Sequence, residues 1–442
     1  MNWLRAIRGR IRSAHADHHA IARGMAWVAL FVLLGSVARA AKEVAIAYRY
    51  GVSTEVDAYL FVFNLVSWPV GVWFSVLSVV LVPLAARIRQ SASAELPHFR
   101  SELLGLTLLL GLALAFLGWL GLPPLLNASW TGLPPATMDI AQTMVPALSL
   151  LAPLGVTTSL FSAWMLAAGR HANTLLESVP ALTILLMLLA FPGGGVEPLV
   201  WGTLAGFAFH LVSLAVPLAR QGEIEAPRLT RQSPQWTPFW QGFGIMLVGQ
   251  ALMSFTGIID QFFAAHLDTG SIATLSYANR ILALILGMGA MAVSRATLPV
   301  FSDAHAQGGK QIIRVATHWV RIMFLFGLAA SFISWLLAPL GVQLLFERGA
   351  FTARDTVIVA EVLRYGLVQL PFYFAGLVMV SLLVSQGKYY VVTIIGIINL
   401  IVKIIANALT VPFFGIGGLM ISTSIMLMFS CIFLSVAILR KY

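Results

Sequence analysis

Charge and cysteine are what this sequence has least of. Of its 442 residues only 10% are charged and 59% are hydrophobic, and the one cysteine is Cys431. A chain with so little charge and with repeated apolar stretches of about 20 residues is not a soluble domain. We therefore predict an all-α, polytopic membrane protein. The lone cysteine lies in an apolar stretch, which excludes a disulfide framework and a cysteine metal site.

Acidic residues are also scarce, because 17 of them stand against 27 lysines and arginines, for a net charge of +10. In a membrane protein a basic excess reports topology, since lysine and arginine collect in cytoplasmic loops. Most basic residues between the apolar stretches fall on one side of an alternating arrangement, and Arg49, Arg348 and Arg354 fall on the other. We expect an inner-membrane protein with both termini in the cytoplasm and no nucleic-acid partner.

About twelve transmembrane helices can be drawn from hydropathy. We expect a basic N-terminal segment at 1–23, an N-terminal lobe of six helices at 24–219, a cytoplasmic linker at 220–238 and a second six-helix lobe at 239–442. Landmarks recur at a nearly constant offset between the halves: Pro83 with Pro299, Pro153 with Pro371, Gly169 with Gly387, and Glu43 with Asp260. Six helices per lobe predict parallel repeats around a central cavity.

Charge interrupts the first apolar helix. Arg39, Lys42 and Glu43 are spaced i, i+3 and i+4, so they share one helix face. A charge inside a lipid-spanning helix costs about 2.5 to 3.5 kcal/mol and normally faces a cavity or the bundle interior. By their distance along each span, further charges also lie in the outer half of the membrane: Asp260, Arg280, Glu361, Arg364 and Lys403. Cations outnumber anions in this set, which predicts a positive cavity for a phosphate or pyrophosphate.

Simpler interpretations stay open for several of these residues. Lys42 and Asp260 could snorkel from helix ends to the membrane surface. Glu361 and Arg364, at i and i+3, could form a structural ion pair. Arg39, Arg280 and Lys403 lie deeper, which favours a role in lining the cavity. Glu177 falls on the inner side of its span.

Three segments of the sequence are similar to those of a known family. The first is Lys42-Glu43-Val44-Ala45-Ile46-Ala47 with Tyr50-Gly51 and Asp57-Ala58-Tyr59, the second is Ser276-Tyr277-Ala278-Asn279-Arg280, and the third is Leu345-Phe346-Glu347-Arg348-Gly349-Ala350-Phe351-Thr352. They resemble the MurJ/MviN family of lipid-linked precursor flippases. The resemblance implies two six-helix lobes, as in the wider superfamily of multidrug and oligosaccharidyl-lipid exporters. By position, Lys42, Asp57 and Arg280 match residues that the family uses in its central cavity.

The sequence also departs from the family's pattern. Ser36, Val70 and Gly71 stand where the family has basic residues, and Asn279 stands where it has an aspartate. Two further C-terminal spans that form a groove for the lipid tail in lipid II flippases are expected to be absent. These departures favour a cargo for exopolysaccharide or O-antigen synthesis over lipid II.

The resemblance and the charges together predict a flippase that moves a polyprenyl-pyrophosphate-linked saccharide from the inner to the outer leaflet by alternating access. We expect no enzyme activity and no cofactor, with coupling to the membrane potential, H⁺ or Na⁺. The predicted substrate-binding residues are Arg39, Lys42, Glu43, Asp57, Arg280, Arg364 and Lys403. The candidate ion-coupling residues are Glu43, Asp260 and Glu177. The predicted partners are the lipid bilayer, the cargo, and glycosyltransferases or a polymerase of the same pathway.

Three other functions stay open at this point. A cation-coupled multidrug exporter would need an anion-rich, mostly apolar and aromatic cavity, which the basic set argues against. A membrane polymerase or acyltransferase would need a large outer loop or a His/Asp/Glu cluster, and the outer connections are short. A scaffold without transport would recruit a polysaccharide synthase through its basic N-terminus.

Overall fold

The computed structural model describes residues 16–91, 93–170, 172–307, 309–385 and 389–439. Within these residues the chain is helical apart from short links, and no strand occurs. Apolar helices are what a membrane requires, because each satisfies its own backbone hydrogen bonds. The first fifteen residues of the predicted basic segment lie outside the described part.

The helices of the first half run from α2 to α9. Their bounds are α2 Ala16–Tyr50, α3 Thr54–Ser91, α4 Leu96–Leu126, α5 Pro135–Ser149, α6 Leu151–Ala167, α7 Ala172–Leu176, α8 Val179–Ala190 and α9 Glu197–Arg220. The second half comprises α10 Trp236–Ala265, α11 Ser271–Gln307, α12 Gly309–Phe346, α13 Ala353–Leu367, α14 Leu370–Ser385, α15 Tyr389–Phe414 and α16 Ile416–Leu439. Two single-turn 3₁₀ helices, Ser93–Glu95 and Ser129–Thr131, lie on either side of α4.

These elements form twelve long helical passages, as hydropathy predicts. Eight described helices are long and apolar enough to cross a membrane alone, and two bent pairs, α5 with α6 and α13 with α14, each make one more. The remaining two are α2 and α11, of 35 and 37 residues. The chain is therefore a multi-pass membrane protein with two six-helix lobes.

The two bent passages occupy equivalent places, because each is the fourth of its half. The bend is 44° between α5 and α6 and 41° between α13 and α14. Pro153 and Pro371 lie in the first turn after each bend, and a proline has no N–H to donate to the carbonyl four residues earlier. Before Pro371 that carbonyl, of Leu367, accepts instead from the Ser331 hydroxyl at 2.8 Å. Matching bends in matching passages are what an internal repeat predicts.

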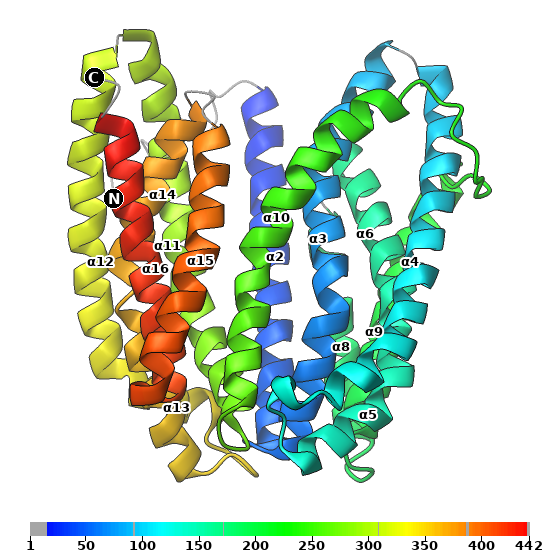
Figure 1. Ribbon diagram of the computed structural model, residues 1–442. Helices are drawn as coiled ribbons and strands as arrows, with labels where there is room; N and C mark the ends of the chain where they lie inside the picture. Colours follow the sequence, from blue (N-terminus) through cyan, green and yellow to red (C-terminus); the bar gives the residue numbers. More distant parts are fainter. Residues whose placement is uncertain (1–15, 92, 171, 308, 386–388, 440–442) are drawn as a thin grey trace, which may run out of the picture.

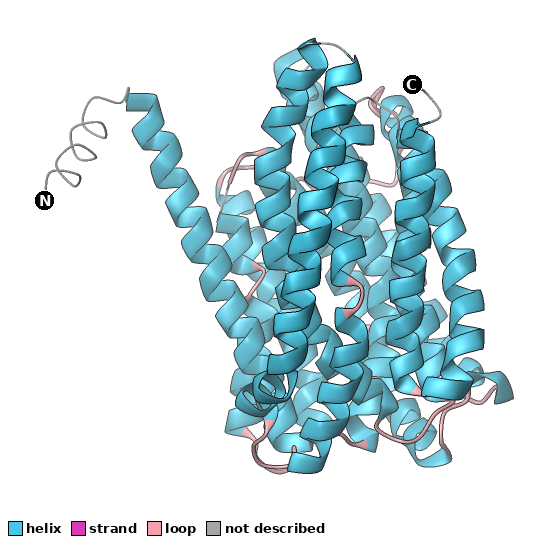
Figure 2. Cartoon of the chain, turned by 90° about the vertical axis from the view of Figure 1, so that its left-hand side faces the viewer, coloured by secondary structure: helices cyan, strands magenta, loops and turns pink. Residues whose placement is uncertain are grey.

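Figure 1 shows α11 to α16 on the left and α3 to α9 on the right, with α2 and α10 between them. We call the end where α2 begins and α16 ends, at the top of Figure 1, the terminus end, and the opposite end the far end. Helix α10 crosses obliquely, and its first turns pack on the first half through Trp236, Phe239 and Phe243. The exact lobe boundaries stay a prediction. In Figure 2 the first turns of α2 diverge from the rest of the bundle.

The link from α9 to α10 is held against α4 by one buried carboxylate. Glu102 accepts hydrogen bonds from the Thr230 hydroxyl at 2.6 Å, the Gln232 amide at 2.8 Å and the Trp236 indole at 2.7 Å. At Gly105 a Cβ would lie 2.1 Å from the carbonyl oxygen of Arg228, so the close approach requires glycine. The connection between the lobes is therefore fixed to the first lobe along much of its length.

Candidate functional site

At the far end the two lobes are joined by a carboxylate that caps a helix of the other lobe. Asp57, on α3, accepts hydrogen bonds from the Gly270 amide at 2.6 Å and the Ala273 amide at 2.7 Å. These amides begin α11, where the first N–H groups have no partner within the helix. Asp57 is buried, with 3% of its surface exposed. This cap ties the start of α11 to the α2–α3 turn.

Backbone groups close the same end. The Tyr277 hydroxyl donates to the Gly51 carbonyl at 3.0 Å, and the Ala350 amide donates to the Tyr48 carbonyl at 2.8 Å. Gly51 has φ +56°, and a Cβ there would lie 2.4 Å from the carbonyl oxygen of Ala350. Both the left-handed backbone and the close approach require glycine at this position. We call these contacts and the Asp57 cap the far-end seal.

Next to the seal lies a charged triad that spans both lobes. The Lys42 ammonium is 2.7 Å from the Glu43 carboxylate, and the Arg280 guanidinium is 3.2 Å from the same oxygen. Glu43 is mostly buried, whereas the Arg280 side chain is 46% exposed. Two cations share one anion, so the triad carries a net positive charge, with the guanidinium exposed.

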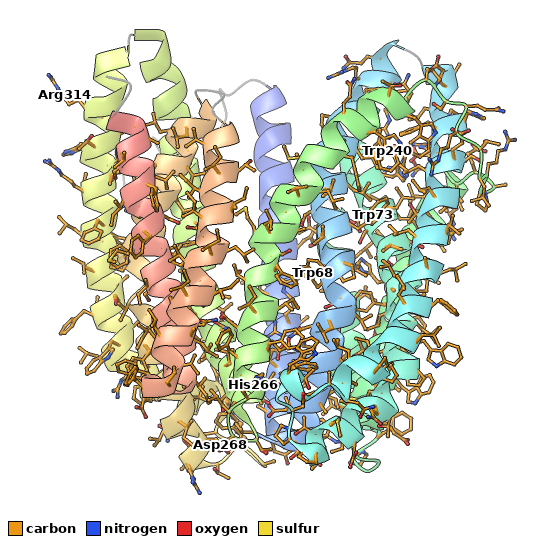
Figure 3. All side chains as sticks on the ribbon, in the orientation of Figure 1. Trp68, Trp73, Trp240, His266, Asp268 and Arg314 are labelled. Atoms are coloured by element: carbon orange, nitrogen blue, oxygen red, sulfur yellow. The ribbon has the colours of Figure 1, made fainter. Side chains whose placement is uncertain are left out.

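Arg280 also lines a cavity of about 430 Å³ between α3, α10 and α11. Its polar lining includes Asn64, Gln261 and Asp260. The Asn64 amide donates to the Gln261 side chain at 2.8 Å, which joins the lobes across the cavity wall. In Figure 3 Trp68 lies between α3 and α10, where its indole donates to the Ser254 hydroxyl at 2.9 Å. The cavity therefore lies at the interface of the lobes, directly behind the far-end seal.

Asp260 is paired with a fully buried ammonium. Lys403, with 1% of its side chain exposed, lies 2.9 Å from Asp260 and also donates to the Leu419 carbonyl at 2.9 Å. The hydroxyls of Ser422 and Thr423 lie 2.8 and 2.5 Å from the same nitrogen. Four oxygens around one nitrogen satisfy the ammonium, and its charge offsets that of the carboxylate.

Comparison with known proteins connects this arrangement to a family. The family model described as lipid II flippase MurJ matches residues 26–442. The chain belongs to the MurJ family of lipid II flippases. The "probable lipid II flippase MurJ" of Bdellovibrio bacteriovorus is 29% identical over 251 residues, which are 56% of this chain and 47% of that protein. The alignment thus spans about half the length of that relative.

Solved structures share the fold. A lipid II flippase MurJ in an inward closed conformation superposes with a TM-score of 0.82 at 19% identity, over 94% of this chain and 87% of that one. An inward-facing multidrug MATE transporter of the MOP superfamily gives a TM-score of 0.76 at 18% identity, over 92% and 94%. The predicted family and fold class are confirmed. The MurJ family is one of transporters, in agreement with the prediction that the chain is no enzyme.

Of the residues predicted to bind substrate, the structure brings Lys42, Glu43 and Arg280 together. Asp57 lies outside the cavity lining, because both of its carboxylate oxygens are used in the far-end seal. Lys403 does not line the cavity. It forms an ion pair with Asp260, which does.

Three other predicted residues lie away from the triad. Arg364 stacks on the Trp335 ring at 4.5 Å and donates to the Trp335 carbonyl, where Trp335 is itself 44% exposed on the outside of the lobe. Arg39 is exposed and donates to Ser36 at 3.1 Å, and it is near enough to Glu177 for an electrostatic interaction. Glu177 accepts from Asn173 at the break between α7 and α8. The structure therefore divides the predicted set into one cluster and separate outliers.

Some residues with clear structural roles were not among the predicted site residues. Arg49 donates to the Phe191 and Gly193 carbonyls at 2.5 Å each and so holds the α8–α9 loop against α2. Gln261 donates to the Phe61 carbonyl across the lobes at 2.9 Å. A single sequence does not show that a glutamine donates a hydrogen bond across the lobes. The one indication that Gln261 lies at the site is its position next to Asp260. Among the described residues no group of three His, Cys, Asp or Glu could hold a metal ion.

Proposed function

We propose that the protein moves a polyprenyl-pyrophosphate-linked saccharide from one leaflet of the membrane to the other by alternating access. The observation that carries the proposal is the position of Arg280, which is exposed in a cavity between the lobes and sealed from one end of the bundle. A guanidinium beside a second cation suits a pyrophosphate, because it can bind two oxygens at once. The polyprenyl chain would stay in the lipid.

We place the terminus end in the cytoplasm. Of the described residues, arginines cluster there: Arg87, Arg89, Arg100, Arg170, Arg220, Arg228, Arg231 and Arg314. The connections at the far end carry only Arg49, Arg348 and Arg354, so the positive-inside rule favours this orientation. The far-end seal would then close the outer side, and the cavity would receive cargo from the inner leaflet.

The energy source is also a proposal. A negatively charged headgroup that moves toward the positive outer side gains about 2.3 kcal/mol per charge per 100 mV, so the membrane potential can drive export. Of the three candidate ion-coupling residues, Asp260 lines the cavity, Glu43 is held by two cations, and Glu177 lies apart. Protonation or Na⁺ binding would therefore act first at Asp260, in competition with Lys403.

The names of the relatives favour lipid II as the cargo, which would place the protein in peptidoglycan synthesis. The preference for an exopolysaccharide or O-antigen unit, which rests on Ser36, Val70, Gly71 and Asn279, stays a prediction. The glycosyltransferases or polymerase of the same pathway remain the expected partners. A cation-coupled drug exporter shares this fold, so the fold does not separate the two functions.

Binding by the purified protein tests the proposal. We expect lipid II and other polyprenyl-pyrophosphate sugars to bind the wild-type protein in titrations in which native mass spectrometry measures the bound fraction. Arg280→Ala should weaken binding about tenfold or more, as for loss of a charge-assisted contact. Arg354→Ala is the matched control, because Arg354 is exposed at the far end. Equal binding by wild type and Arg280→Ala, or stronger binding of cationic drugs than of lipid II, would refute the proposal.

A further inference from the structure

A second cavity lies on the outside of the second lobe, away from the interface of the lobes. It has a volume of about 570 Å³ and is formed by α12, α14 and α16. Its walls are aliphatic, aromatic and sulfur-containing side chains, and the polar exceptions are Arg321 and Ser435. The Ser435 hydroxyl already donates to the Cys431 carbonyl at 2.7 Å. We call this cavity the outer groove.

The outer groove opens away from the bundle. Its rim residues Leu325, Ile432 and Val436 are 63%, 49% and 41% exposed. An apolar surface of this kind on a membrane helix faces lipid, so hydrocarbon is the solvent that fills it. It shares no lining residue with the cavity that Arg280 lines.

A basic stripe leads into the outer groove. Arg314, His318 and Arg321 are spaced i, i+4 and i+7 on α12, so they lie on one face, and all three are exposed. Figure 3 shows Arg314 pointing away from the bundle near the terminus end. Among the described residues neither arginine has a carboxylate partner within ion-pair distance. The stripe therefore places guanidinium groups without a carboxylate partner among the described residues beside the apolar outer groove.

The level of Arg321 fits the membrane surface. Below it α12 continues as an apolar helix from Met323 to Phe346, which at 1.5 Å per residue covers the ~30 Å hydrocarbon core. Arg321 thus lies at the boundary between headgroups and hydrocarbon, and the groove runs from that boundary along Phe324, Phe372 and Met428. A cation at the boundary with an apolar slot below it has the shape and charge of a site for an anionic lipid.

We propose that the outer groove binds an anionic phospholipid of the leaflet at the terminus end, with its phosphate on Arg321 and Arg314 and an acyl chain along the groove. Charge complementarity selects the headgroup, since a guanidinium binds phosphate oxygens in pairs. The occupant is a bilayer phospholipid because the groove opens directly to the bilayer, where such lipids are abundant. This site is separate from the proposed cargo site and does not depend on it.

Lipid titration of the purified full chain tests the assignment. Wild-type protein in detergent should retain phosphatidylglycerol about tenfold more tightly than phosphatidylcholine in native mass spectrometry, and phosphatidylglycerol should raise its thermal unfolding midpoint. Arg321→Gln should lose most of that preference. Arg354→Gln, which removes an exposed arginine at the far end, should keep it.

A second variant changes the apolar wall of the outer groove instead of the charge of Arg321. Ile432→Trp narrows the rim at a half-exposed position and should lower the retention of both phospholipids while the far-end seal is unchanged. Full preference for phosphatidylglycerol in Arg321→Gln would overturn the proposal. So would tighter binding of undecaprenyl phosphate than of phosphatidylglycerol in the same titration, or a dimer whose formation excludes lipid from the groove.

Discussion

Lys403 is the residue whose surroundings constrain it most. Its ammonium is buried among four oxygens, one of which belongs to Asp260 in the wall of the central cavity. Taking an ammonium out of water costs several kcal/mol unless a counter-charge and hydrogen bonds replace the water. Each charge of the pair therefore offsets the cost of burying the other.

Lys403→Met should leave Asp260 with Asn407 as its remaining hydrogen-bond donor and destabilise the fold by about 3 to 5 kcal/mol, because one buried charge is left unpaired. The double variant Asp260→Asn with Lys403→Met removes both charges and should recover most of the loss. Thermal unfolding in detergent measures both, with Arg354→Met as the control. If the double variant is as unstable as Lys403→Met, the pair is not coupled.

At this scale the sequence predicts some roles and misplaces others. Lys42, Glu43 and Arg280 could be brought together because helical spacing and depth put charges at one level of the membrane. The role of Asp57 could not be read in this way, since a carboxylate near a helix end can cap another helix or face a cavity, and only the tertiary fold decides. Arg364 lies at the right depth but on the outer face of its helix.

Among the elements, the α2–α3 turn is the part of the seal that tolerates least change. Gly51→Ala adds a Cβ at φ +56° that would lie 2.4 Å from the Ala350 carbonyl oxygen, so the turn and the facing loop cannot meet as they do. We expect this variant to hold the far ends of the lobes apart. Gly415→Ala is a close control, because Gly415 has φ +52° but open space around it.

Spin labels on cysteines at Glu197 and Arg354, in a Cys431→Ser background, would measure that change by double electron–electron resonance. Both positions are exposed at the far end, one on each lobe. Gly51→Ala should lengthen the distance distribution relative to wild type and to Gly415→Ala. An unchanged distribution in Gly51→Ala would show that this turn does not control closure.

The link between the lobes gives a second prediction for an element. Glu102→Ala removes the acceptor for Thr230, Gln232 and Trp236, so the link should detach from α4. Trypsin should then cut at Arg228 or Arg231 several-fold faster. Glu225→Gln lies on the same link and leaves the three hydrogen bonds to Glu102 in place, since Glu225 acts on Arg100 through its charge. Its cleavage rate should therefore stay close to that of wild type. Trypsin cleavage of Glu102→Ala that is no faster than cleavage of wild type would contradict this account.

The helices were predictable because a membrane permits few kinds of secondary structure. Long apolar runs must be helices, and basic loops mark one side, so twelve passages follow from composition and charge. The bends at Pro153 and Pro371 also follow from the residue type. The attachment of the link to α4 did not, because the donors to Glu102 come from residues about 130 positions further along the chain.

In the whole molecule, the far-end seal, the charged triad and the cavity follow one another along the interface of the lobes. The hydrogen bonds and ion pairs that join the lobes lie close to the far end, apart from the Trp68–Ser254 contact and the bond from Trp236 to Glu102. The first turns of α10 also pack on the first half at the terminus end. Opening the seal while the terminus end closes would expose Arg280 to the other side of the membrane. That exchange is what alternating access requires.

Transport in proteoliposomes tests the central claim most directly. Fluorescent lipid II in one leaflet should reach the other leaflet faster with wild-type protein than in empty liposomes, and an imposed potential, positive on the destination side, should speed it. Arg280→Ala should reduce the rate at least tenfold at equal protein content, whereas Arg354→Ala should not. Lipid II movement that is equal in wild type, Arg280→Ala and empty liposomes would contradict the account.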